Sequence, residues 1–337
     1  MIGLKRTGTL TSRGPVMAAA LAVSAIGLAS LTAAVPALAQ NYPVKPVSIV
    51  VGVPPGGATD WMSRTLAQQL QEKWKQSVVV DNKPGAGGKI ANEYVGRATP
   101  DGHTLLNATS IIAAGQVFDK DKSFDAEKQL APLATMMYAP YVIIVPADMP
   151  AKSLGEYFAF AKANPGKLNF AAVTNTGQML DSFALFQQAG VQITVVPYNG
   201  GAPALRAVVA NEVQGYFGAV FGMQAQINGG RIRALAVTSA RRFSQLPDIP
   251  TVKEATGMDF DAGVQYGFAT TAGTPRDVVA KIAADILEVV KRPEIMDAIR
   301  KQGYEPSSLG VEEFTRLMNR EARRAVETAR LANIQPQ

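Results

Sequence analysis

The chain alternates short, nearly continuous apolar runs with longer stretches in which apolar residues recur every three or four positions. Residues 47–53 are rich in β-branched side chains, as in a strand buried on both faces. Residues 59–71 carry Met62, Leu66 and Leu70 at helical spacing. Because this order of strand, loop and helix returns downstream, the pattern predicts an α/β fold with largely parallel sheets.

The second unit has a strand at residues 78–80, a loop at residues 84–88 and a helical face formed by Ile90, Tyr94 and Ala98. Further strands are expected in DGHTLLNATS, LNFAAVTNTG, QITVVPYNGG, VQGYFGAV and IRALAVTS, with helices at residues 182–189 and 202–210. Two extended apolar segments, residues 136–150 and 264–275, close at proline and are expected to cross between two halves of the protein and to act as its hinge.

The N-terminus predicts a secretory signal peptide over residues 1–39. Three early cations precede an uncharged stretch at residues 16–31, and Ala37-Leu38-Ala39 forms a small-x-small cleavage site before Gln40. A membrane anchor is the alternative, but the apolar stretch is short for a span and Pro36 with the cleavage site follows it. We therefore expect a mature chain in the periplasm.

Removal of those three cations lowers the net charge from +6 to +3. A weak and dispersed positive charge does not indicate nucleic-acid binding. The sequence contains no cysteine, which excludes disulfides and a lipid-modified N-terminal cysteine. The remaining length is typical of two domains, and we expect a monomer that is not lipid-anchored.

Two glycine-rich turns follow predicted strands and precede predicted helices. Gly56 and Gly57 allow close backbone approach, and Thr59 or Asp60 begins a helix whose first N–H groups lack partners; PGAGG at residues 84–88 repeats the arrangement. Such helix starts attract anions, so the two turns could converge on one cleft. The alternative is that both are only tight strand-to-helix turns.

The same glycines do not fit two other phosphate-binding motifs. A P-loop requires a glycine where Lys83 stands and Ser or Thr where Ile90 stands. A dinucleotide fingerprint lacks its last small residue at Ile90, and an exported chain meets few nicotinamide cofactors. No cofactor is therefore expected.

Catalytic and metal chemistry have little support in this sequence. His103 is the single histidine and lies in a PDGHTLL turn, so an exported serine hydrolase would have to be built around it. One histidine and no cysteine disfavour zinc. Asp119, Asp121 and Asp125 lack the glycine and the glutamate of a calcium loop. We expect neither an enzyme nor a metal site, and the hydrolase is kept as a remote alternative.

The blocks YPVKPVSIVVGVPPGGATD, VVVDNKPGAGGKIANEYVGRATPDGHTLL, VPYNGGAPAL, LPDIPTVKEATG and TTAGTPRDVVAKI occur in this order. In this order they closely resemble the tripartite tricarboxylate transporter receptors, also called Bug-type periplasmic binding proteins. The resemblance implies a two-lobed Venus-flytrap fold of type II with two crossover strands. Lobe 1 would comprise residues 40–140 and 263–337, and lobe 2 residues 141–262. It also implies a small organic carboxylate as ligand and the permease subunits of a transporter as partner, or a sensor protein as the alternative.

The expected ligand contacts lie at loops of both lobes. In lobe 1 they are Gly57, Ala58, Thr59, Asp60, Gly85, Ala86, Gly87, Thr109 and Ser110; in lobe 2 they are Thr174, Thr176, Gly177, Tyr198 and Gly218. The resemblance implies that the first-lobe loops meet one carboxylate of the ligand, often through ordered water.

The second lobe departs from the family pattern in ways that bear on the ligand. Where many relatives carry a serine and a histidine, this chain has Met179 and Leu180, and Gly218 replaces an acidic strand end. The expected lining residues are Met179, Phe217, Phe221 and Met223. We therefore expect an acid with an aromatic or apolar body; a two-residue shift of the alignment would instead bring Gln178 or Asp181 to the site.

Overall fold

The computed structural model describes residues 1–3, 42–120, 123–174, 176–220 and 223–334. The expected signal peptide lies outside the described residues except for its first three. Tyr42–Gln337 forms one compact unit. Among the described residues, no helix combines the length and the apolar character needed to cross a membrane.

Strands of the first sheet are β1 (Val47–Val51), β2 (Val78–Asn82), β3 (Thr104–Thr109), β9 (Gly263–Thr271), β10 (Glu305–Pro306) and the first part of β4 (Leu130–Pro146). Their order is β2-β1-β3-β9-β4, with β10 paired to β4. The first three strands are parallel, whereas β9 is antiparallel to β3 and to β4. The predicted parallel units are therefore present, and the crossing strands make the sheet mixed.

Strands of the second sheet are β5 (Asn169–Val173), β6 (Thr194–Tyr198), β7 (Gly215–Ala219), β8 (Ile232–Val237) and the last part of β4. Strand β5 lies between β6 and β7 in parallel register, while β4 pairs antiparallel with β7 and β8. Strand β4 thus serves both sheets: residues 130–140 pair with β9, and residues 141–146 pair with β7 and β8.

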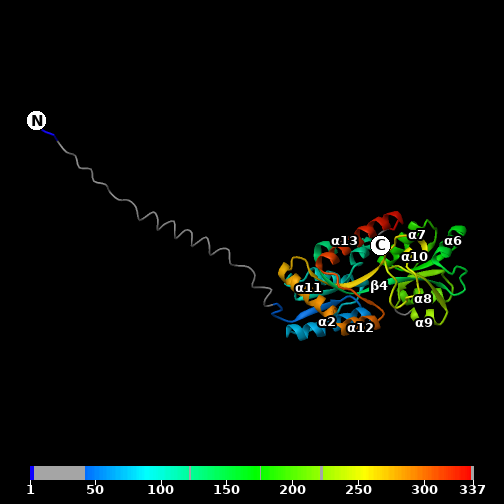
Figure 1. Cartoon of the computed structure of the whole chain (residues 1–337), viewed down its shortest axis with the longest axis horizontal. Helices are drawn as coiled ribbons and strands as arrows, with labels where there is room; N and C mark the ends of the chain where they lie inside the picture. The colour runs from blue at the N-terminus through cyan, green and yellow to red at the C-terminus, as the bar shows by residue number, and fades with distance from the viewer. Residues whose placement is uncertain (4–41, 121–122, 175, 221–222, 335–337) are drawn as a thin grey trace. The chain divides into compact units, whose positions relative to one another are not determined.

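The helices cover both faces of these sheets. They are α2 (Ala58–Trp74), α3 (Lys89–Gly96), α4 (Ile112–Gly115), α5 (Ala126–Gln129), α6 (Leu154–Ala163), α7 (Gly177–Ala189), α8 (Gly201–Val209), α9 (Gln224–Asn228), α10 (Val252–Thr256), α11 (Arg276–Val290), α12 (Pro293–Lys301) and α13 (Val311–Leu331), with short 3-10 turns η2 (Ala86–Gly88) and η3 (Gln116–Phe118). Figure 1 shows β4 running from the group of α2, α11 and α12 to the group of α6, α8, α9 and α10.

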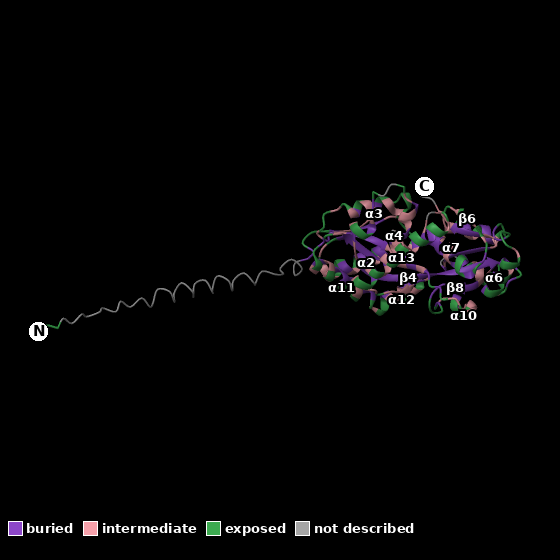
Figure 2. Cartoon of the chain, turned by 90° about the horizontal axis from the view of Figure 1, so that it is seen from above, coloured by how far each residue is buried: buried purple, intermediate pink, exposed green. Residues whose placement is uncertain are grey.

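Each sheet has its own apolar core. In the first, Met62, Leu66 and Leu70 of α2 pack with Ile282 and other residues of α11 against the sheet, as the helical spacing predicted. In the second, Phe170, Phe217 and Leu185 belong to a separate cluster. Figure 2 shows buried strands in the interior and exposed helix faces on the outside. The predicted α/β class is confirmed.

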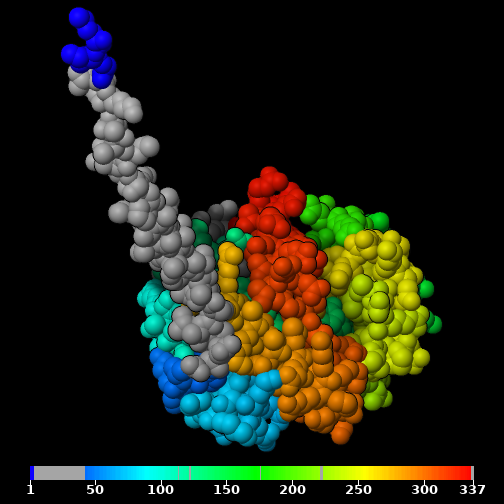
Figure 3. All heavy atoms as spheres, turned by 60° about the vertical axis from the view of Figure 1, so that its left-hand side comes forward, coloured from blue at the N-terminus to red at the C-terminus, as the bar shows by residue number. Residues whose placement is uncertain are grey.

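The C-terminal helix α13 links elements of both sheets. It packs on β4, on α4 after the first sheet's β3, and on α7 after the second sheet's β5. In Figure 3 it lies on the surface between the orange segment that contains α11 and α12 and the yellow and green segments of the second sheet's helices.

Candidate ligand-binding site

The first loop, residues 52–57, connects β1 to α2 and leaves the start of that helix open. Gly56 has φ +97°, a left-handed conformation that glycine adopts without strain. Gly57 is the N-cap of α2, and no side chain caps the helix. The first-turn N–H groups, those of Ala58 and Thr59 among them, therefore lack a side-chain acceptor and favour an anion.

Asp60 lies in this first turn, but its carboxylate is turned into the protein. It is only 4% exposed. One oxygen accepts the Gly56 N–H at 3.0 Å and Arg64 Nε at 2.9 Å; the other accepts Arg64 Nη2 and Asn82 Nδ2, both at 3.0 Å. The bonds from Arg64, together with those from Asn82 and Gly56, lower the pKa of Asp60 to about 2. The carboxylate therefore braces the loop.

The second loop, residues 83–88, connects β2 to α3 and holds an unusual backbone. Gly85, Ala86, Gly87 and Gly88 all have positive φ, and Ala86 at +46° adopts a left-handed conformation that is costly for a residue with a Cβ. Gly85, Ala86 and Gly87 are exposed. Strained backbone of this kind is concentrated at functional sites, which agrees with the expected role of this loop.

The two loops lie against each other. Lys83 N–H donates to the Val51 carbonyl at 2.8 Å. A Cβ on Gly52 would come within 3.0 Å of Gly88 Cα, so the backbones approach as closely as glycine allows. The parallel register of β1 and β2 places both helix starts at the same edge of the sheet. The two predicted anion-binding turns are thus brought together.

Thr109 and Ser110 end the third parallel strand at that edge. Thr109 pairs with Tyr266 of β9. Ser110 is 1% exposed; its N–H donates to the Gln265 carbonyl at 2.9 Å, and its hydroxyl accepts the Gln265 N–H at 3.1 Å. Ser110 therefore fastens β3 to the crossing strand.

The second sheet brings its own strand ends to the same stretch of β4. Tyr266, which faces Thr109, also pairs with Met137 of β4, and Ala219 at the end of β7 pairs with Tyr141. Met137 and Tyr141 are four residues apart on β4, which is roughly 13 Å of extended chain. The carboxyl end of β3 in the first sheet and that of β7 in the second therefore lie near one another. This is the place that the sequence analysis expected for a ligand.

Thr174, Thr176 and Tyr198 join the loops at the ends of β5 and β6. The N–H and the hydroxyl of Thr174 both donate to the Tyr198 carbonyl, at 3.0 and 3.1 Å. Thr176 is the N-cap of α7 and its hydroxyl accepts the Met179 N–H at 3.4 Å. Gly177 is buried, and its Cβ position lies 3.1 Å from Ile111 Cβ. It packs against the segment that follows β3.

Gly218 lies beside a tyrosine hydroxyl that the sequence analysis did not single out. Tyr216 Oη is 2.4 Å from a Cβ built on Gly218 and 3.0 Å from one built on Gly201, and it accepts Gln178 Nε2 at 3.3 Å. Helix α8 begins at Gly201, and no side chain caps it. The NGG motif at residues 199–201 was the available signal for this further open helix start.

Two of the four expected apolar lining residues, Phe217 and Met223, are buried in the core. Phe217 is fully buried and stacks on Tyr141 with centroids 4.9 Å apart, and Met223 is 2% exposed. Leu180 packs with Phe118 and Ala325. These side chains satisfy the core because their strands and helices need apolar neighbours, so the expectation that Phe217 and Met223 line the site was wrong.

Two further expected lining residues have different outcomes. Met179 is half-buried beside the small cluster that contains Leu180. Phe221 lies outside the described residues. Gln178, the polar alternative, is buried at the end of β7 and donates to the Phe217 carbonyl.

Asp181, one turn further along α7, forms a buried ion pair with the C-terminal helix. Arg324 Nη2 lies 2.5 Å from Asp181 Oδ1 and 2.6 Å from Glu321, while Arg324 Nη1 donates to the Asp261 carbonyl at 3.0 Å. The second oxygen of Asp181 is buried without a hydrogen-bond partner. Burial raises the pKa of Asp181 to about 7, opposed by Arg324 and reinforced by Glu321 and Asp261.

His103 is a bonded turn residue. Its Nε2 accepts the Val44 N–H at 3.3 Å, and its Nδ1 lies 3.1 Å from the Asp101 carbonyl oxygen. Both ring nitrogens therefore already have partners, one in the turn and one in the segment before β1. Within the described ranges, no group of three or more acidic or histidine side chains is placed to hold a metal ion. Asp121, part of the acidic segment considered for calcium, lies outside those ranges.

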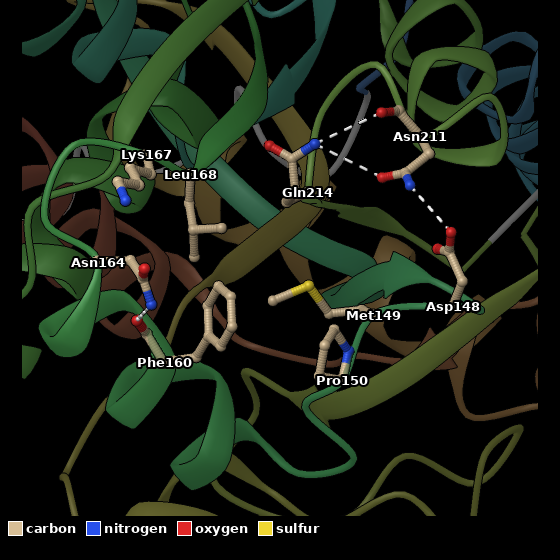
Figure 4. Close-up of a pocket in the computed structure, with 9 residues that line it drawn as sticks. All are labelled: Asp148, Met149, Pro150, Phe160, Asn164, Lys167, Leu168, Asn211 and Gln214. Carbon is tan, nitrogen blue, oxygen red and sulfur yellow. Dashed lines mark hydrogen bonds between the residues drawn. The ribbon is translucent and has the colours of Figure 1, made fainter.

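A hollow of about 310 Å³ lies at the opposite end of the second sheet (Figure 4). Lys167 and Leu168 precede β5, and Gln214 precedes β7, so the hollow adjoins the amino ends of these strands. In Figure 4, the Gln214 amide donates to Asn211, and the Asn211 amide donates to Asp148. It is separate from the loops described above.

Comparison with known proteins agrees with the resemblance. The model of the "Tripartite tricarboxylate transporter family receptor" matches residues 62–332. Protein BugT of Bordetella pertussis is 31% identical over 289 residues, covering 85% of this chain and 89% of BugT.

Two solved structures share the fold and carry named ligands. R. palustris Rpa4515 with adipate has a TM-score of 0.73 and 26% identity, covering 88% of this chain and 100% of its own. MatC from Rhodopseudomonas palustris with bound malate has a TM-score of 0.68 and 25% identity, covering 85% and 99%. The predicted family and binding-protein fold are confirmed, and the family is one of solute receptors, not an enzyme class. The chain belongs to the tripartite tricarboxylate transporter receptor family of periplasmic binding proteins.

Proposed function

We propose that this protein is a periplasmic receptor that binds a small dicarboxylate and delivers it to the membrane permease of a tripartite tricarboxylate transporter. The observation that carries the proposal is the pair of turns at residues 57–59 and 85–87, which lie side by side, have no side-chain cap and leave N–H groups available to an anion. These turns, with Thr109 nearby, form the first wall.

The second wall comprises Thr174, Thr176, Gly177, Tyr198 and Gly218, to which we add the start of α8 at Gly201. The start of α8 is a third open helix end, and it supports binding of a second carboxylate at this wall. Residues 40–140 and 263–337 would then form one lobe and residues 141–262 the other. The division of β4 between its two sheets at residues 140 and 141 supports this boundary.

The ligand is an open-chain dicarboxylate with an aliphatic middle. The relatives with adipate and malate support this class. Because Phe217 and Met223 are buried in the core, the structure offers no support for an aromatic body stacked on them.

Calorimetric titration with matched acids tests the proposal. Adipate and hexanoate have the same carbon chain but differ in the second carboxylate, so adipate should bind at least tenfold more tightly. At 100 times its dissociation constant, adipate should add about 2.7 kcal/mol to the free energy of unfolding. The receptor assignment fails if sugars or cations raise the unfolding midpoint and no acid does. Tighter binding of benzoate than of adipate would reverse the ligand class alone.

A further inference from the structure

We propose that Asn82 and Arg64 are positioning residues that hold the first loop in the shape that binds a carboxylate, without touching the ligand themselves. The inference rests on the proposed function and names residues outside the expected contacts. It follows from the bonds around Asp60, which connect the first loop, the second strand and helix α2.

An aspartate in the first turn of an anion-binding helix creates an electrostatic problem. A carboxylate near the open N–H groups repels an anionic ligand unless its charge is neutralised. Here Arg64 bonds both oxygens of Asp60 in a bidentate pair, at 2.9 and 3.0 Å. Arg64 therefore cancels the charge of Asp60, so that the carboxylate can fix the Gly56 N–H without repelling the ligand.

Asn82 ties the two loops to this pair. Its amide nitrogen donates to the Val53 carbonyl at 3.1 Å and to Asp60 at 3.0 Å, and its amide oxygen accepts from Arg64 at 3.1 Å. Because Asn82 is the last residue of β2, the second loop begins directly after it. One side chain thus sets the shape of the first loop and its distance from the second, which is preorganisation of a binding site.

The surroundings of Asp60 are simple enough for a charge test. Among the described residues, its ionic partner is Arg64 on its own helix. The groups that bond it from β2 and from the first loop, the Asn82 amide and the Gly56 N–H, are neutral donors. Arg64 is about half exposed, with a side-chain exposure of 53%, so its replacement leaves the core intact.

The first experiment replaces Asn82 and measures loop protection and binding. Hydrogen–deuterium exchange of the unliganded N82A protein should rise in peptides covering both loops, while the peptides of α7 and α8 keep wild-type exchange. Calorimetry with adipate should show affinity reduced by tenfold to a hundredfold. Unchanged exchange in the loops would overturn the inference. Failure of adipate to bind the wild type would count against the proposed function, while the exchange result would still decide the role of Asn82.

The second experiment separates charge from structure by a pH profile. In R64Q the carboxylate of Asp60 is left without its cation, so adipate binding should weaken at least tenfold at pH 8. The ratio of variant to wild-type dissociation constants should shrink as the pH falls to 4.5, because Asp60 without Arg64 begins to take up a proton there, while the wild-type carboxylate stays ionised. The ratio cancels the ionisation of adipate itself. Adding D60N to R64Q should remove this pH dependence and restore part of the affinity.

Arg97 supplies the matched control. It pairs with Glu93 at the same i,i+4 spacing, and its side chain is 63% exposed. R97Q should leave the adipate affinity and its pH profile as in the wild type. A pH-independent loss in R64Q, with no rescue by D60N, would overturn the electrostatic role of Arg64.

Discussion

Two buried aspartates of this protein pair with arginines, and their pKa values shift in opposite directions. Asp60 pairs with Arg64 one turn along the same helix, while Asp181 of α7 pairs with Arg324 of α13, far along the chain. The pKa of Asp60 is lowered to about 2, whereas that of Asp181 is raised to about 7. Both side chains are 5% exposed, so burial alone does not explain the difference.

The number of hydrogen-bond donors and the neighbouring charges explain why the two pKa values shift in opposite directions. Asp60 accepts four hydrogen bonds, from two nitrogens of Arg64, from Asn82 and from the Gly56 N–H. Asp181 accepts one, from Arg324, which it shares with Glu321, and its second oxygen has no partner. An ion pair therefore stabilises a carboxylate only when its other lone pairs are also satisfied. The Asp60–Arg64 pair shapes the first loop, and the Asp181–Arg324 pair holds α7 against α13.

The largest expected effect is the loss of Arg324. R324M leaves Asp181 buried without a cation, while Glu321 keeps Arg320, and we expect the free energy of unfolding to fall by about 3–5 kcal/mol at pH 7.5. Urea denaturation measures it. R97M, which removes an exposed arginine of an i,i+4 pair, should change stability by less than about 0.5 kcal/mol. A loss below about 1 kcal/mol in R324M would show that the buried pair contributes little.

The next effect is the pH dependence that Asp181 imposes. Because its pKa is higher in the folded chain than the ordinary value of 3.8, the folded state binds the proton more tightly than the unfolded state. The contribution of Asp181 to the free energy of unfolding is then greatest below about pH 4 and is lost as the pH rises to about 7. Relative to D181N, the wild type should lose on the order of 4 kcal/mol across this window. Parallel stability profiles of the two proteins would contradict the raised pKa.

Much of the fold was predictable because periodicity reports which face of an element is buried. The pattern of Met62, Leu66 and Leu70 predicted α2, and the β-branched run at residues 47–53 predicted β1, which ends two residues earlier at Val51. The crossing segment at residues 136–150 corresponds to β4, which begins at Leu130 because its first part pairs with β9. That pairing depends on a strand more than a hundred residues away.

The site was predictable to the extent that glycine and proline determine local backbone. The open turns at residues 56–57 and 85–87 could be located because glycine permits their conformations. The bonds of Asp60 to Asn82 could not, since they depend on the register of β1 and β2. The prediction that Phe217 lines the site was wrong, because the sequence alone does not tell whether an apolar residue at a strand end packs in the core or faces a cleft.

The smallest effect concerns the N-caps of α7 and α2. The first helix is capped by a side chain, and the second is not. Thr176 caps α7, and T176A should cost about 1 kcal/mol of folding free energy, because the Met179 N–H loses its side-chain acceptor and keeps only the Thr176 carbonyl. The start of α2 has Gly57 instead, with φ −86° and no atom within 4 Å of its Cβ position. G57S is thus the reciprocal change: its hydroxyl can cap α2 and should stabilise the fold by a few tenths of a kcal/mol.

In G57S, the affinity for adipate should fall while the stability of the fold rises. The new hydroxyl of G57S would accept an N–H group that the proposed carboxylate needs, so adipate should bind more weakly to a more stable protein. T176A should weaken adipate binding less than G57S does, because the Thr176 hydroxyl of the second wall is already engaged with the Val173 carbonyl and the Met179 N–H. Urea denaturation and calorimetry on both variants give the four values required. If G57S binds as tightly as the wild type, the open start of α2 is not where the ligand's charge is held, and the first wall loses its distinction from the second.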